Sequence, residues 1–87
     1  MSVFVVERSL PGISMENLAA AQKAAIAQAA TMRAGGTPVT YVRSMFMPDD
    51  GRCFCTFTAE SAGVVAKLNT DARIPFERVT AALDLEP

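Results

Sequence analysis

The sequence predicts a single α+β domain, residues 1–87, in the order strand, helix, strand, strand, helix, strand. Three observations predict it: short apolar, β-branched runs bounded by proline and glycine, an alanine-rich segment with helical spacing, and two central strands joined by a D-D-G turn. This order of elements is that of the ferredoxin-like fold. Right-handed crossovers then place both helices on one face of a four-stranded antiparallel sheet.

The first strand is expected over residues 2–9, where β-branched and apolar residues predominate. Pro11 and Gly12 end it, because this pair is typical of a turn. Ser14 is the expected N-cap of the first helix. Glu16 lies in the first turn, where the helix dipole favours a negative charge.

The first helix is expected to reach about Arg33 and to end at residues 35–36, which are both glycine. Eight of the twelve residues 19–30 are alanine, so the helical propensity is high and the side chains are small. Such a helix can lie close to the sheet, or its small face can pack on another helix. The residues expected to face the sheet are Leu18, Ala25, Ile26, Ala29 and Met32.

The central hairpin is expected to pair residues 38–47 with residues 52–58 around a turn at residues 49–51. This turn sets the register, and side chains then alternate between the two faces of the sheet. The pairs expected to face the helices are Phe46 with Cys53, Ser44 with Cys55, and Val42 with Phe57. The pairs expected on the opposite, open face are Met45 with Phe54, Arg43 with Thr56, and Tyr41 with Thr58.

The second helix is expected to be capped by Thr58 or Ser61. Its inward face is expected to comprise Val64, Val65, Leu68 and Ala72. The last strand is expected over residues 79–85, where the alternation would turn Leu83 towards the helices.

The open face of the sheet needs a second cover, because one layer of helices shields only one face. Its mixture of apolar and polar side chains is typical of an interaction site. A homodimer formed through the two sheets is the simplest solution, since a twofold axis lets one sequence cover itself. A cleft beside that interface would suit a small hydrophobic ligand. The residues expected to line this ligand-binding cleft are Glu7, Tyr41, Arg43, Met45, Phe54 and Thr56.

The composition narrows the classes of partner. The net charge is -1, with eight basic and nine acidic residues, and no basic stripe is present to attract nucleic acid. No segment has the roughly 20 apolar residues needed to cross a bilayer. The N-terminal residues lack the basic and apolar regions of a secretory signal. We therefore expect a cytoplasmic protein without nucleic-acid or membrane partners.

The chain carries no recognisable catalytic constellation. It has no histidine, so no serine or cysteine has an imidazole base to activate it, and we expect no catalytic residue. Cys53 and Cys55 are its two cysteines. Since a closed zinc site needs four ligands, we expect buried thiols rather than a metal site. Glu7 and Arg43 are expected to form a charge pair, either functional in the cleft or structural at the dimer interface.

Several short motifs resemble a family of small bacterial domains of unknown function. They are V-E-R in the first strand, L-P-G, Y-V-R-S, D-D-G, F-C-T-F and I-P-F-E-R-V. That family includes a nickel-binding protein with a dimeric ferredoxin-like fold. The resemblance therefore implies this fold and a dimer, and it makes nickel a candidate cofactor.

Within the resemblance, Tyr41, Ser44 and Cys55 match an aromatic residue, a serine and a cysteine of the family. Many relatives carry a histidine near the positions of Leu68 and Asn69, and this chain has none. Nickel favours imidazole among protein ligands. The resemblance thus supports the fold and the dimer better than the metal.

The leading hypothesis is a non-enzymatic, dimeric ferredoxin-like binding protein. A second is a cofactor-free monooxygenase or isomerase with a pocket beside the sheet, by analogy between folds. A third is a pure assembly module without a small ligand.

Overall fold

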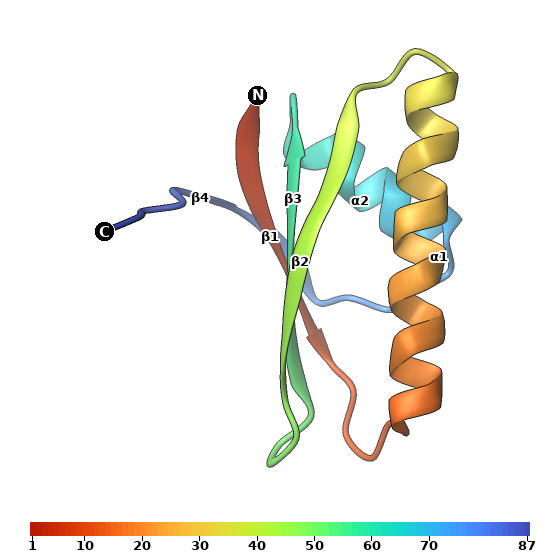
Figure 1. The fold of residues 1–87 in the computed structure, drawn as a ribbon, viewed down its shortest axis with the longest axis vertical. Coiled ribbons are helices and arrows are strands. Elements are labelled where there is room, and N and C mark those ends of the chain that lie inside the picture. The colour runs from red at the N-terminus through yellow and green to blue at the C-terminus, as the bar shows by residue number, and fades with distance from the viewer.

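The computed structural model describes residues 1–87 and has six regular elements. In chain order these are β1 (Ser2–Ser9), α1 (Met15–Ala34), β2 (Val39–Met47), β3 (Arg52–Ala59), α2 (Ala62–Asp71) and β4 (Arg78–Ala82). The strands form one sheet in the order β2-β3-β1-β4, and each neighbouring pair is antiparallel. Both helices lie on the same face of this sheet (Figure 1). The structure confirms the predicted ferredoxin-like α+β fold.

Both helices begin at serine caps. The backbone N–H of Asn17 donates to Ser14 Oγ at 3.1 Å, and that of Val64 donates to Ser61 Oγ at 3.3 Å. Each serine thereby satisfies one of the N–H groups that a first helical turn leaves free. Of the two predicted caps of α2, Ser61 is therefore the correct one.

The face of α1 that meets the sheet is made largely of small residues. Ala25 and Ala29 are buried, and Ala21 and Met32 pack against the core. The prediction that Ile26 faces the sheet is wrong, since this residue is 45% exposed. The buried stripe follows a four-residue spacing, and Ile26 lies roughly 100° further around the helix.

Neither helix combines the length and the hydropathy needed to span a membrane.

The hairpin has the predicted register near its turn. Four pairs are confirmed: Phe46 with Cys53, Met45 with Phe54, Ser44 with Cys55, and Arg43 with Thr56. The two thiols therefore lie on the helix-facing side of the sheet, where both are buried.

A β-bulge lies between Tyr41 and Arg43. In the part of β2 farther from the turn, it reverses which side chains face the helices. Val42 is the additional residue, so Tyr41 pairs with Phe57 rather than with Thr58. Because a bulge adds one residue to one strand, it inverts the alternation beyond it. The prediction that Tyr41 lies on the open face is therefore wrong. Its ring meets the buried ring of Phe57 edge-on, with centroids 5.5 Å apart, whereas Val42 is 37% exposed.

The last strand is shorter than predicted. β4 ends at Ala82, which pairs with Val3 near the beginning of β1. Since β1 itself begins at Ser2, almost no partner strand remains for the residues that follow. Leu83 was expected to face the helices, but Leu83 and Leu85 are each 85% exposed. Figure 1 shows this C-terminal segment leaving the sheet on the side opposite the helices.

The core fills the layer between the helices and the sheet. Its largest fully buried side chains come from β1, β2, β3 and α2, and they include Val6, Val39, Phe57, Val65 and Leu68. The predicted inward face of α2 is confirmed, because Val64 and Ala72 pack against the same cluster.

The tip of the hairpin is tied to the connection between β1 and α1. The N–H of Leu10 donates to the carbonyl of Gly51 at 2.7 Å. Gly51 has a φ of 76°, and a Cβ added there would lie 2.5 Å from the Cα of Pro11. Both the left-handed backbone and the close approach of the chain require glycine at this position.

Candidate ligand-binding site

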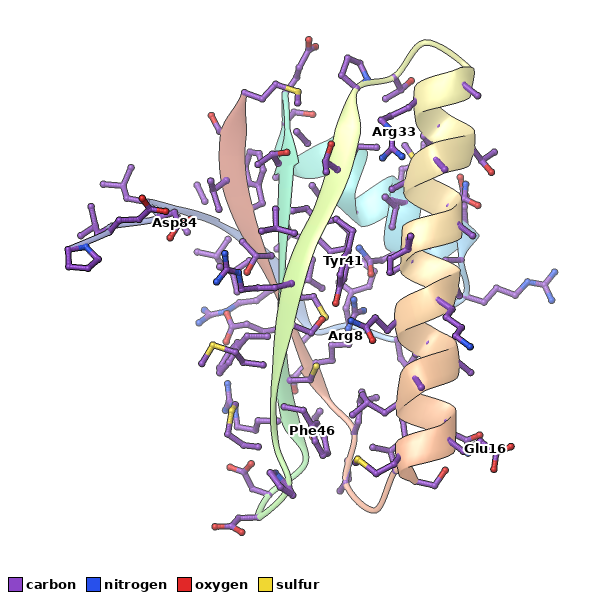
Figure 2. All side chains as sticks on the ribbon, in the orientation of Figure 1. Arg8, Glu16, Arg33, Tyr41, Phe46 and Asp84 are labelled. Atoms are coloured by element: carbon purple, nitrogen blue, oxygen red, sulfur yellow. The ribbon has the colours of Figure 1, made fainter.

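A cavity of about 160 Å³ lies between α1 and the sheet. Nine of its twelve lining residues are hydrophobic, and Arg8, Gln22 and Ser44 supply polar groups. Arg8, Tyr41 and Phe46 extend from the sheet towards α1 in this layer (Figure 2). The other lining residues are Leu10, Leu18, Ala21, Ala25, Cys53, Cys55 and Ile74.

The alternation of β1 places Arg8 in this cavity. Phe4 and Val6 face the helices and are buried, and Arg8 is the next residue on the same face. It is only 3% exposed. Sequence reasoning missed this residue as a functional candidate. The signal was nonetheless present, because the strand pattern that buries Phe4 and Val6 also buries a charged side chain.

No carboxylate lies among the hydrogen-bond acceptors of Arg8. Its guanidinium donates to Asn69 Oδ1 at 2.8 Å, to the carbonyl of Pro75 at 3.3 Å and to Cys55 Sγ at 3.4 Å. The ion pairs of the chain join Glu7 to two other arginines and Lys67 to Asp71, and none includes Arg8. A buried positive charge therefore lies beside the cavity without a carboxylate partner.

Hydroxyl and thiol groups connect the surface of α1 to Arg8. Gln22 Nε2 donates to the hydroxyl of Tyr41 at 3.0 Å, and this hydroxyl shares a hydrogen bond with Ser44 Oγ. Ser44 Oγ in turn donates to Cys55 Sγ at 3.0 Å, the same sulfur that accepts from Arg8. Tyr41, Ser44 and Cys55 thus form one hydrogen-bonded chain along the cavity wall.

The thiol of Cys53 is poorly suited to chemistry. Burial, reinforced by the neighbouring Cys55, raises the pKa of Cys53 to about 11. Cys53 therefore remains a protonated thiol near neutral pH, whereas nucleophilic attack and metal binding both require the thiolate. The two sulfur atoms lie 3.8 Å apart, and both cysteines are free.

On the open face, Glu7 does not pair with Arg43, so the predicted charge pair is wrong. Glu7 instead contacts Arg52, with 3.2 Å between Oε1 and Nη2, and it also pairs with Arg78. The strand order explains this choice, because β3 and β4 flank β1 whereas Arg43 lies on β2, beyond β3. The hydrogen bond from Arg78 is the main reason why the pKa of Glu7 is lowered. The charge of Arg52 acts in the same direction.

The predicted cleft residues are divided between the two faces of the sheet. Arg43, Met45 and Thr56 share an open hollow of about 240 Å³ on the helix-free face. Phe54 lies on the same face. The guanidinium of Arg52 covers its ring, with Arg52 Cζ 5.3 Å from the centroid of the Phe54 ring. Tyr41 belongs instead to the cavity beneath α1. The other residues of the hollow are Val3, Val5, Ala82, Leu83 and Asp84.

The side chains do not fit a nickel site. No group of three or more His, Cys, Asp or Glu side chains is arranged to hold a metal ion, and the chain has no imidazole to offer. Of the two thiols in the cavity, Cys53 is held protonated and Cys55 accepts a hydrogen bond from a guanidinium. This positive charge opposes the binding of a cation at the same sulfur.

Comparison with known proteins agrees with the fold. The crystal structure of SCO4226 from Streptomyces coelicolor A3(2) matches with a TM-score of 0.81, over 99% of this chain and 100% of that chain. The sequence identity is 18%, so this likeness shows the fold alone. No curated protein matches the chain. The family described as "Nickel responsive protein SCO4226-like" matches residues 4–81. The chain therefore belongs to the SCO4226-like family.

Proposed function

We propose that this protein is a non-enzymatic, dimeric binding protein that holds a small organic ligand between α1 and the sheet. The observation that carries the proposal is the convergence of Arg8, Tyr41 and Ser44 on a cavity with otherwise mainly apolar walls. A few fixed polar groups in an apolar concavity are the usual composition of a small-molecule site. The alanines of α1 leave room for the ligand, because their side chains end at Cβ.

Nickel is the ligand that the family's description suggests. We infer that the cavity of this chain does not take it, since it combines a protonated thiol, a guanidinium and no imidazole. Calorimetric titration with Ni²⁺ is expected to give no binding heat. Stoichiometric binding heat that disappears in Cys55→Ser would contradict this inference and would support nickel binding in the cavity.

The dimer is proposed to form through the open face of the sheet. Met45 is 63% exposed there, and the partly buried Val3, Val5 and Phe54 lie on the same face. The C-terminal segment leaves the sheet on the same side (Figure 1), and its Leu83 and Leu85 are each 85% exposed. A second copy would cover this apolar surface and leave the α1 cavity accessible, because the helices lie on the other side.

A second ligand position is proposed at the edge of that interface. The hollow bounded by Arg43, Met45 and Thr56 would become a cleft once a partner sheet covered it. Glu7 and Phe54 lie beside it. The carboxylate of Glu7 pairs with Arg52 and Arg78, and the guanidinium of Arg52 lies over the ring of Phe54. This position retains five of the six residues that the sequence predicts for the cleft.

The cavity is tested by thermal unfolding with toluene and benzamide, two uncharged probes of suitable size. Both are expected to raise the Tm of the wild-type protein, because a ligand that binds only the folded state stabilises it. Ala21→Leu should remove this effect by filling a lining position, whereas Ala27→Leu makes the same change at an exposed position of α1 outside the cavity. An unchanged Tm with both probes would contradict the proposed site.

Sedimentation equilibrium tests the dimer. A species of twice 9.2 kDa is expected. A stable monomer at high micromolar concentration would reject the dimer and leave the cavity proposal intact.

A further inference from the structure

We propose that the ligand of the α1 cavity is a small aromatic or branched monocarboxylate, bound through its carboxylate by Arg8. This inference rests on the proposed function, because it names the chemical class of ligand for the same cavity. It follows from three properties of the site: an uncompensated charge, unused hydrogen-bond donors and a limited apolar volume.

The charge is the first property. A guanidinium stays protonated in proteins, and a buried charge without a counter-charge is unfavourable. Arg8 is 3% exposed, and its hydrogen-bond partners are an amide oxygen, a carbonyl oxygen and a sulfur. Glu7 is adjacent in sequence but points to the opposite face, where two other arginines hold it. A bound anion would supply the missing negative charge.

The unused donors are the second property. A guanidinium has five N–H groups, and three of those on Arg8 have acceptors in the protein. Two remain for a ligand. The planar fork of arginine matches the two oxygens of a carboxylate, and Arg8 is one of the residues that line the cavity.

The volume is the third property. The cavity of about 160 Å³ is close to the roughly 150 Å³ that holds one benzene ring in a protein interior. Leu18, Ala21, Ala25 and Phe46 surround it with apolar surface. A ligand with one ring or a short branched chain therefore fits, and a long-chain fatty acid does not.

The test compares benzoate with benzamide, which has nearly the same shape and no charge. Calorimetric titration of the wild-type protein is expected to show benzoate binding roughly tenfold or more tightly, as a charge-assisted hydrogen bond would give. Arg8→Met should abolish this preference, so that benzoate and benzamide bind this variant with similar affinity. Arg33→Met is the matched control. Arg33 also donates to a backbone carbonyl, that of Val39 at 2.8 Å, but does not line the cavity. This variant should keep the preference.

The outcomes separate this inference from the proposed function. If benzamide and toluene bind and benzoate binds no more tightly, the proposal of a carboxylate ligand is overturned. The proposal that the cavity is a ligand-binding site is then retained. No binding of any probe would overturn both. If Arg8→Met does not fold, the wild-type comparison still decides, and Arg8→Lys should retain part of the preference without the planar fork.

Cys55 Sγ, which accepts from Arg8 at 3.4 Å, is the group that competes with a bound carboxylate for this guanidinium. A preference for benzoate that appears only in Cys55→Ser would show that the sulfur already occupies Arg8, and this result would overturn the inference. The same preference in wild type and in Cys55→Ser would support it.

Discussion

Arg8 donates to Asn69 Oδ1 across 2.8 Å, and the two residues are 3% and 0% exposed. This contact joins the first strand to the second helix through the interior of the domain. Asn69 is held in turn by the carbonyl of Val65, to which its Nδ2 donates at 2.8 Å. The amide satisfies one N–H of the guanidinium but leaves its charge uncompensated.

Asn69→Ala is expected to destabilise the fold by about 2–3 kcal/mol, because it removes the nearest acceptor of a buried charge. Urea denaturation measures the loss. Thr70→Ala, at the exposed neighbouring position, should change stability by less than about 0.5 kcal/mol. In an Arg8→Met background the loss at position 69 should shrink, because the charge that needed the acceptor is gone. An equal loss of stability from Asn69→Ala in both backgrounds would contradict an energetic coupling between Arg8 and Asn69.

Gly51→Ala is expected to cost about 1–3 kcal/mol, since alanine is strained at a φ of 76° and its Cβ would clash with Pro11. The control is Gly63→Ala in α2, where an added Cβ would meet only Ser61 Oγ at 3.8 Å. That change should stabilise the protein by about 0.5–1 kcal/mol through helix propensity. Thermal or urea unfolding measures the change in stability of each variant. Stabilisation by Gly51→Ala would contradict the close approach of Gly51 to Pro11.

Glu7 should contribute stability that depends on pH. Its pKa is lowered in the folded protein, chiefly by Arg78, so the unfolded chain binds the proton more readily. The contribution is therefore complete above the ordinary carboxyl pKa of 4.5 and is lost as the pH falls through the lower folded value. Wild type should be more stable than Glu7→Gln near pH 7, and the difference should shrink below pH 4.5. Urea midpoints across this range measure it.

Glu60→Gln is the control for this pH series, because Glu60 is exposed and forms no ion pair. Its midpoints should follow those of wild type at each pH. A Glu7→Gln difference that stays constant down to strongly acidic pH would show that the carboxylate makes no specific contribution.

Met45→Lys is expected to weaken the proposed dimer, because it places a charge on the apolar part of the open face, near Arg43. Ile26→Lys is the matched control, since Ile26 is also a large exposed hydrophobic residue, 45% exposed, but lies on α1. Sedimentation velocity should show a loss of the dimer for the first variant alone. Equal behaviour of both variants would place the interface elsewhere.

Local sequence signals determined the order of the elements and most of their ends. Ser14 and Ser61 satisfy the first turns of the helices, and Gly51 permits the left-handed turn that sets the register of the hairpin. These signals act between residues close in the chain, so they can be read without knowing the fold. The pairing of Ser44 with Cys55 follows directly from the turn.

The tertiary structure alone decided which distant side chains meet. The bulge at Val42 has no distinctive sequence signal, since valine suits either face of a strand, yet it moves Tyr41 into the cavity. Strand order gave Glu7 its partners Arg52 and Arg78, because β3 and β4 lie beside β1. Arg8 and Asn69 are 61 positions apart. Only the packing of α2 on the sheet brings a charge and an amide of such separation together beside a cavity.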